Sequence, residues 1–211
     1  MADRETLDAI GLRHGTDKAS RAHDYLRTYD AFLAPLRDHP VSLLEIGVLG
    51  GASLRTWRDY FPLGRIIGVD IDPKAAAQAG ERIEVHFGDQ SDADGMSALG
   101  ERLGPFDVVV DDGSHIWAHQ ISTLRALLPH VRPGGFFILE DLHTSHGRWA
   151  PKYRGAGGET ATAYCRRVAE RVLAPGATEE AIEDAFLRDA PKQIETVTLS
   201  RHAAIFRRKA R

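Results

Sequence analysis

Short apolar runs alternate with helix-like segments along the first two thirds of the chain. The apolar runs are typical of buried strands and lie at 41–47, 65–70, 82–88, 106–111 and 136–140. The stretches between them repeat with the period of a helix at 52–60, 73–79, 97–103 and 116–131, and Pro133-Gly134-Gly135 is typical of a turn. Strands that alternate with helices predict a mostly parallel, doubly wound sheet.

The two ends of the chain differ from this pattern. Residues 1–40 are expected to be helical, with a turn at Gly15-Thr16-Asp17-Lys18, and residues 142–159, which hold four glycines, are expected to be a loop. Helices are expected at 160–173 and 178–188, followed by two strands at 194–199 and 203–207. The short gap between these strands predicts an antiparallel hairpin. The fold class is therefore α/β, a Rossmann-like, mostly parallel seven-stranded sheet with a C-terminal antiparallel hairpin.

Size and charge narrow the classes of function. With 211 residues we expect a single domain over 1–211. The formal net charge of -3 gives no basic field for nucleic acid or an anionic membrane, so we expect neither as a partner. The N-terminal residues are polar and no apolar run reaches the ~20 residues of a membrane span. Cys165 is the one cysteine, so we expect a packing role for it and a cytoplasmic location.

A glycine-rich turn follows the first strand and suggests a cofactor site. Gly47, Gly50 and Gly51 lead into the next helix, where backbone N–H groups can approach a ligand. Asp70 ends the second strand, where an acid can accept hydrogen bonds from ribose hydroxyls. Asp89-Gln90 follows the third strand and is placed to bind an adenine amino group. These positions share the carboxyl edge of a parallel sheet, where ligands bind in such folds.

Two cofactors fit this edge, and the residues favour S-adenosylmethionine (SAM) over NAD. Leu49 stands where the NAD fingerprint has its second glycine. Glu45 would repel a pyrophosphate, whereas it suits the amino group of methionine. SAM carries no phosphate and needs no phosphate cradle.

Acidic residues follow two further strands. Asp111-Asp112-Gly113-Ser114-His115 ends the fourth strand, and Glu140-Asp141 ends the fifth. Neighbouring strands lie about 4.8 Å apart, so these carboxylates meet at one rim and repel each other unless they bind a cation or a proton. Oxygen ligands select Mg²⁺, Mn²⁺ or Ca²⁺ over zinc. The alternative is that the acids cap the next helix and hold the loop.

Together these motifs make the chain resemble the class I methyltransferases. More narrowly it resembles the metal-dependent sugar O-methyltransferases of the mycinamicin type and the related mycobacterial enzyme for methylmannose polysaccharide. The resemblance runs from Gly15 to about His143. The loop of this chain after Asp141 departs from the family's pattern. Relative to larger members, we expect the N-terminal auxiliary domain to be lacking. The motifs are Gly15-Thr16-Asp17-Lys18, Leu44-Glu45-Ile46-Gly47, Gly50-Gly51-Ala52-Ser53, Gly88-Asp89-Gln90-Ser91-Asp92, Asp111-Asp112-Gly113-Ser114-His115 and Glu140-Asp141.

The resemblance assigns roles to several of these residues. It implies Asp112, Glu140 and Asp141 as ligands of Mg²⁺ or Mn²⁺, and a cap formed by residues 1–40 over the cofactor. It places Thr16 or Lys18 near the methionine carboxylate, and Asp111 toward SAM or the backbone. The expected cofactor-binding set is Thr16, Lys18, Glu45, Gly47, Gly50, Ser53, Asp70, Asp89, Gln90 and Asp111.

A sugar hydroxyl needs a base, and two histidines are candidates. His115 shares the rim with the expected metal, so we favour it as general base, with His143 as the alternative. His119 lies one helical turn beyond His115 and is expected to support it. His146, Trp149 and Tyr153, in the loop, are candidates to line the acceptor pocket, and the alternative for Trp149 is a packing anchor.

The sequence thus predicts Mg-dependent methyl transfer from SAM to a hydroxyl of a sugar or glycoside. The alternatives are O-methylation of a catechol-like molecule, a role like that of cephalosporin hydroxylases, and a SAM-binding scaffold without catalysis. The expected partner is a small-molecule acceptor, and we expect a homo-oligomer.

Overall fold

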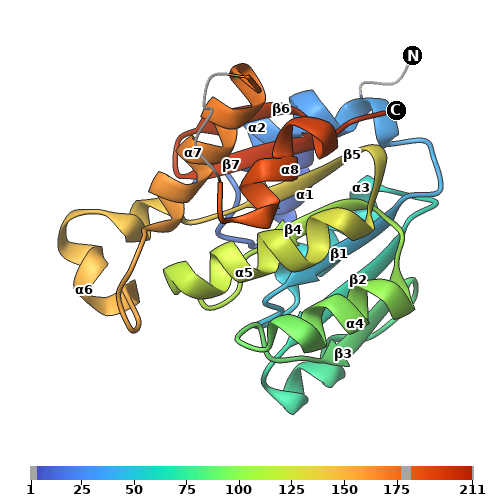
Figure 1. Ribbon diagram of the computed structural model, residues 1–211. Helices are drawn as coiled ribbons and strands as arrows, with labels where there is room; N and C mark the ends of the chain where they lie inside the picture. The colour runs from blue at the N-terminus through green and yellow to red at the C-terminus, as the bar shows by residue number, and fades with distance from the viewer. Residues whose placement is uncertain (1–3, 177–181, 211) are drawn as a thin grey trace. The chain divides into compact units, whose positions relative to one another are not determined.

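The computed structural model describes residues 4–176 and 182–210 (Figure 1). The chain forms two compact units, one up to Gly88 and one from Asp89 onward. Within the described ranges, no helix combines the length and the apolar character that a membrane crossing requires.

The first unit carries three parallel strands in the order β3-β2-β1. β1 is buried along its whole length, and its last residue, Ile46, lies beside Val69 of β2. The helix α3 then begins after Gly51, whose φ of 70° is the left-handed conformation that glycine adopts without strain. The elements of this unit are α1 (Leu7–His14), α2 (Leu26–Leu33), η1 (Ala34–Leu36), β1 (Ser42–Ile46), α3 (Ala52–Tyr60), β2 (Arg65–Asp70), η2 (Pro73–Gln78) and β3 (Ile83–Phe87).

The N-terminal helices pack on this unit through large apolar side chains. α1 contacts both α2 and α3. Leu7, Tyr29 and Trp57, one from each helix, are fully buried. α1 ends at Gly15, whose φ of 74° and N–H bonds to the last carbonyls of the helix form a glycine C-cap. The expected turn at Gly15–Lys18 is therefore confirmed.

The second unit carries four strands in the order β4-β5-β7-β6. β4 and β5 are parallel, while β5-β7 and β7-β6 are antiparallel. The elements are α4 (Ala93–Leu103), β4 (Phe106–Asp111), α5 (Trp117–Leu127), η3 (Leu128–His130), β5 (Val131–Leu139), η4 (Leu142–Ser145), η5 (Gly147–Trp149), α6 (Ala150–Tyr153), α7 (Ala161–Leu173), α8 (Ala185–Gln193), β6 (Ile194–Ser200) and β7 (Ala203–Arg208). The predicted C-terminal hairpin is confirmed.

Several predicted boundaries are wrong for local reasons. α4 begins at Ala93 because the Asp92 side chain caps it by accepting from the Gly95 N–H. The helix predicted at 116–131 stops at Leu127, and η3, which contains Pro129, leads directly into β5. The predicted turn at 133–135 lies within β5, where the register with β4 shifts. Part of the helix predicted at 178–188 lies outside the described residues, and its described part becomes helical only at Ala185, after the Asp184 cap.

The segment after β5 was expected to be a loop, and this is wrong in part. It contains three short helical turns, η4, η5 and α6, before α7 begins after the Thr160 cap. Within this unit, Figure 1 shows the turn that carries α6 standing apart from the long helices α5 and α7. Its two glycines Gly157 and Gly158 have φ of 93° and 100°, which favours glycine and explains the composition that suggested a loop.

Candidate functional site

The end of β1 holds a buried ion pair. Glu45 and Lys18 are 0% and 1% exposed, and Lys18 Nζ lies 3.3 Å from Glu45 Oε1. The Ser53 hydroxyl donates to Glu45 Oε2 at 2.6 Å. The turn that contains Thr16 and Lys18 is thereby tied to the strand end that precedes the glycine turn. The resemblance implies that Thr16 or Lys18 lies near the methionine carboxylate, and the structure gives the Lys18 ammonium Glu45 as a partner.

Asp70 anchors the glycine-rich turn through its carboxylate. Asp70 Oδ2 accepts from the N–H groups of Val48, at 2.8 Å, and Leu49, at 3.3 Å, while Oδ1 accepts from Asp72 N at 2.8 Å. Partial burial acts to raise the pKa of Asp70, but these N–H donors outweigh it and hold the pKa below its usual value. A carboxylate has about four lone-pair sites, so Oδ1 keeps capacity for a further donor such as a ribose hydroxyl.

Leu49 supports this turn at an unusual backbone angle. Its φ is 47°, and its side chain is 93% exposed. A non-glycine residue in the left-handed region is uncommon and marks a constrained turn. Gly47, with φ of 91°, precedes it. The backbone from Gly47 to Gly51 therefore curls around the Asp70 carboxylate, as expected for a turn shaped to meet a ligand.

In the second unit, Gln90 and Asp111 bind each other. Gln90 Nε2 donates to Asp111 Oδ1 at 2.6 Å, and Gln90 Oε1 accepts from Ser114 N at 2.8 Å. Both side chains are buried. Asp89 is partly exposed, and a hydrogen bond from Ser91 lowers the pKa of its carboxyl. Of the pair expected to meet adenine, Gln90 thus holds the loop after β4 through Asp111 and Ser114, and Asp89 is bound to Ser91.

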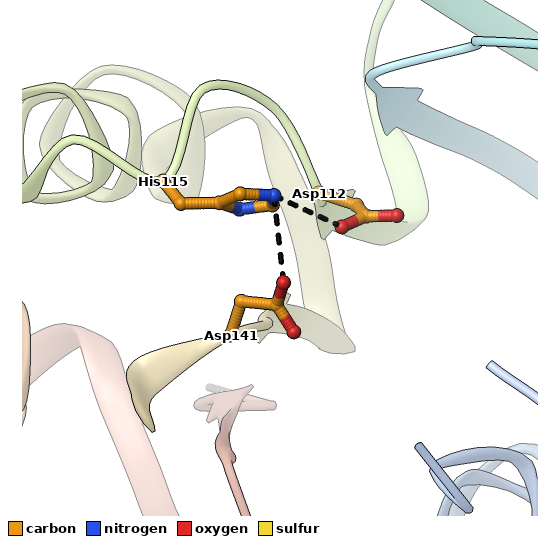
Figure 2. Close-up of side chains that lie close together, drawn as sticks. All are labelled: Asp112, His115 and Asp141. Atoms are coloured by element: carbon orange, nitrogen blue, oxygen red, sulfur yellow. Dashed lines mark ion pairs between the residues drawn. The ribbon is translucent and has the colours of Figure 1, made fainter. Parts of the chain in front are cut away.

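Acidic and histidine side chains meet at the ends of β4 and β5. We use the name rim for Asp112, His115 and Asp141. Asp111 pairs in register with Leu139, so Asp112 and Glu140 are the next residues on neighbouring strands. Asp112, His115 and Asp141 each offer one ligand atom, and these atoms lie within 4.8 Å of one another. Figure 2 shows the His115 imidazole between the two carboxylates, with Nε2 3.4 Å from Asp141 Oδ2 and 3.9 Å from Asp112 Oδ1. Glu140 is 1% exposed and is not part of this group.

Two members of the rim have strained backbones. His115 and Asp141 both have φ of 58°, in the left-handed region that disfavours side chains other than those of glycine and a few polar residues. Such strain is retained where the surrounding structure needs a side chain in one orientation. Here it turns the His115 imidazole and the Asp141 carboxylate toward each other, and α5 begins only after His115, at Trp117.

The donor set fits a hard divalent cation. Two carboxylates from different strand ends can each supply oxygen, which Mg²⁺ and Mn²⁺ prefer, and water completes the shell of such ions. His115 Nδ1 is buried without a hydrogen-bond partner among the described residues, while Nε2 faces both acids. The rim therefore suits a divalent cation held by Asp112 and Asp141.

A pair of histidines, His143 and His202, lies beside this rim. His143 Nδ1 is 3.8 Å from Asp141 Oδ1, and the His143 ring lies 4.5 Å from the ring of His202. His202 lies in the turn between β6 and β7 and was missed by the sequence reasoning, because its contact with His143 depends on a strand order that local pattern does not give. The available signal was a histidine in a two-residue hairpin turn, with φ of 65°, where asparagine or glycine is usual.

Aromatic rings extend the rim toward α6. The Trp149 ring meets the His143 ring edge-on at 5.9 Å, and the Tyr153 ring meets the His115 ring edge-on at 5.8 Å. His119 does not contact His115 in the described contacts; its Nδ1 pairs with the Ser114 hydroxyl at 2.9 Å. Burial raises the pKa of the Cys165 thiol to about 12, which supports a packing role.

Comparison with known proteins shows what this chain is similar to. Residues 44–142 match the profile described as a methyltransferase domain. The chain is 43% identical over 157 residues to 8-demethyl-8-(2-methoxy-alpha-L-rhamnosyl)-tetracenomycin-C 3'-O-methyltransferase of Streptomyces olivaceus, an alignment of 71% of this chain and 39% of that relative. The chain thus spans less than half the length of this curated relative.

Solved structures agree with the sequence matches. The mycinamycin-pathway methyltransferase MycE, in complex with Mg and SAH, superposes with a TM-score of 0.86 at 30% identity, covering 99% of this chain and 54% of that one. A second MycE complex, with Mg, SAH and mycinamycin VI, gives a TM-score of 0.83, also at 30% identity, covering 99% of this chain and 55% of that one. The predicted seven-stranded, mostly parallel α/β fold and the resemblance to mycinamicin-type enzymes are confirmed: residues 44–142 match a methyltransferase domain, and the chain is similar in sequence and fold to sugar O-methyltransferases.

Proposed function

We propose that this chain transfers the methyl group of SAM to a hydroxyl of a sugar or glycoside, with Mg²⁺ held at the rim of β4 and β5. The observation that carries the proposal is the convergence of Asp112, His115 and Asp141 within 4.8 Å. It stands in a chain related to enzymes named for sugar O-methylation and to a structure that holds Mg and SAH. The acceptor enters as a small molecule.

The first unit would bind the cofactor. Asp70 would accept from the ribose, and the glycine turn would meet the methionine moiety beside Glu45. The tie between Lys18 and Glu45 supports the proposal that residues 1–40 cap the cofactor. The further cofactor residues proposed in this unit are Thr16, Gly47, Gly50 and Ser53. Those proposed in the second unit are Asp89, Gln90 and Asp111.

Asp112 and Asp141 would hold the metal, with Glu140 as the third proposed ligand. A bound divalent cation would lower the pKa of the acceptor hydroxyl. His115 would accept the proton from the hydroxyl oxygen as that oxygen bonds to the methyl carbon and the carbon–sulfur bond breaks. The carboxylates of Asp112 and Asp141 support this role, because they lie beside Nε2 and orient the imidazole toward the rim. His143 is the alternative base. Because the His143 ring lies beside the ring of His202, a comparison of His115→Ala with His143→Ala also needs His202→Ala.

The acceptor is proposed to present two neighbouring oxygens. Mg²⁺ prefers six oxygen ligands, and three carboxylates that each bind through one oxygen leave about three places. Two adjacent substrate oxygens would fill two of them and fix the reacting oxygen in line with the methyl group. A catechol also presents two neighbouring oxygens and is the second candidate acceptor. The aromatic rings of Trp149 and Tyr153, which contact His143 and His115, favour an aromatic acceptor of this kind.

Paired acceptors test this proposal. A glycoside with a vicinal diol is compared with its deoxy analogue, which lacks the neighbouring hydroxyl, with SAM and Mg²⁺ present, and a catechol forms the third arm. We expect methyl transfer to the diol and at least tenfold slower transfer to the deoxy analogue, since orientation by chelation is lost. Equal rates would remove the second oxygen from the mechanism, and transfer to catechol alone would replace the sugar.

Two further proposals concern the whole protein. We propose a homo-oligomer, to be measured by light scattering. We also propose a cytoplasmic location, which the single cysteine, buried in α7, supports.

A further inference from the structure

A basic segment borders the acidic rim of the second unit. We use the name basic segment for residues 147–154, which contain η5 and α6 and the three cations Arg148, Lys152 and Arg154. Residues 142–158 contain no Asp or Glu, although the chain as a whole carries a net charge of -3. The next acid, Glu159, already binds Arg167 at 2.7 Å. This segment is therefore locally positive in a chain of the opposite sign.

The three cations are available to a ligand. Arg148, Lys152 and Arg154 are exposed, and none of them forms an ion pair with an acid in the described part of the chain. Arg148 and Lys152 instead lie over aromatic rings. The Arg148 guanidinium is 5.0 Å from the centre of the Trp149 ring, and Lys152 Nζ is 4.8 Å from the centre of the Tyr153 ring. A cation held on an aromatic face keeps its outer side open to an anion.

The same two rings connect the cations to the rim. Tyr153 contacts His115 at 5.8 Å between ring centres, and Trp149 contacts His143 at 5.9 Å. The Tyr153 ring thus contacts both the Lys152 ammonium and the His115 ring, which places this cation close to the rim. Trp149 and Tyr153 therefore each contact both a histidine beside the acidic residues and a cation of the basic segment.

We infer that the basic segment selects an acceptor that carries an anionic group, a phosphate ester or a carboxylate, on the sugar that is methylated or on the unit next to it. The inference rests on the proposed function and names its substrate class. Asp112 and Asp141 repel an anion, while Arg148, Lys152 and Arg154 attract it, so the charge pattern orients the acceptor with its hydroxyl at the rim. Arg and Lys are the side chains that bind phosphate and carboxylate in proteins.

Matched acceptors and matched variants test the inference. Initial rates are measured with three hexosides of one ring configuration: a neutral methyl hexoside, the hexose 1-phosphate and the methyl hexuronide. The variants are Arg148→Gln, Lys152→Gln, Arg154→Gln and the triple variant. Arg102→Gln, at an exposed cation on α4, is the matched control. Because phosphate and carboxylate both bind Mg²⁺, the substituted variants show whether the effect belongs to the protein's own cations.

The expected result is a preference for both anionic acceptors in kcat/KM. Each single substitution lowers that preference about threefold, and the triple variant lowers it at least about tenfold, as expected for exposed charge pairs. The neutral hexoside and the Arg102→Gln control stay unchanged, and added salt weakens only the anionic acceptors. Equal kcat/KM for neutral and anionic acceptors, or a preference that survives the triple variant, overturns the inference.

A binding measurement separates this inference from the proposed function. Calorimetry with SAH present, in the absence of Mg²⁺, measures the affinity of the methyl hexuronide for the wild type and the triple variant. Weaker binding to the triple variant supports the inference even when no acceptor is methylated, an outcome that contradicts the proposed function alone. Efficient methylation of the neutral hexoside, with identical hexuronide binding by both proteins, keeps the function and refutes the inference.

Discussion

Replacing Lys18 by methionine removes the ammonium that faces a wholly buried carboxylate. Lys18 Nζ lies 3.3 Å from Glu45 Oε1, and the two residues are 1% and 0% exposed. Methionine has a similar length and no charge, so the substitution leaves packing nearly intact. It leaves Glu45 with the Ser53 hydroxyl but without its cationic partner.

The structure sets the size of the expected loss. Removing one member of a buried ion pair costs about 3–5 kcal/mol, because the other charge stays desolvated. We take the lower end, about 3 kcal/mol, because the Ser53 hydrogen bond remains. For a chain of this length each kcal/mol shifts Tm by roughly 2–4 °C, so Lys18→Met is expected to melt roughly 6–12 °C below the wild type.

The assay is urea unfolding followed by circular dichroism, together with thermal melts. The double variant Lys18→Met/Glu45→Gln is the control, since it removes both charges and should recover most of the loss. SAM affinity, measured by calorimetry, is expected to fall in the single variant, because the turn at Gly15–Lys18 loses its tie to β1. A cost below about 1 kcal/mol for Lys18→Met would refute the reasoning that Glu45 is a buried anion held by Lys18.

Four further outcomes follow from the structure, three at the site and one at Asp59 in the first unit. Asp70→Ala is expected to weaken SAM binding by roughly ten- to a hundredfold, the value of a charged hydrogen bond, and calorimetry with unchanged affinity would remove the ribose role. Asp112→Asn should raise the Mg²⁺ concentration for half-maximal turnover by about tenfold or more, and full activity after EDTA would exclude the metal. His115→Ala should keep SAM binding and lose roughly 10²–10⁴ in rate, whereas the same loss in His143→Ala alone would reverse the two roles. Partial burial acts to raise the pKa of Asp59, but hydrogen bonds from His14, Arg58 and Arg13 outweigh it and lower the pKa from a usual 3.8 to about 2. The stability that the ionised Asp59 provides is therefore complete above about pH 4 and is lost as pH falls through about 2. Urea titrations at several pH values should show this dependence, and Asp59→Asn should lack it.

Much of the fold could be predicted because buried strands leave a strong local signal. The runs that became β1, β2 and β4 are apolar and end in Gly or Asp, and their bounds match within about one residue. Segments with mixed signals were harder. Pro133-Gly134-Gly135 is typical of a turn, but pairing with β4 around a register shift keeps it within β5.

The site was predictable where strand ends meet, and not where distant turns meet. Asp112 and Asp141 follow neighbouring parallel strands, so topology alone brings them together. His202 reaches His143 only because β7 pairs with β5 in the reverse direction, which no local pattern specifies. Likewise, the partner of Lys18 could not be read from sequence, because this buried ion pair depends on how the turn after α1 meets β1, two segments far apart in the chain.

Methyl transfer from labelled SAM tests the central claim most directly. The protein is incubated with SAM that carries a trideuterated methyl group, a panel of glycosides, and either Mg²⁺ or EDTA, and the products are analysed by mass spectrometry. The account predicts one labelled methyl group on a sugar oxygen, with Mg²⁺ only, and none with Asp141→Asn. No labelled glycoside from a protein that binds SAM, or equal labelling in EDTA, would contradict it.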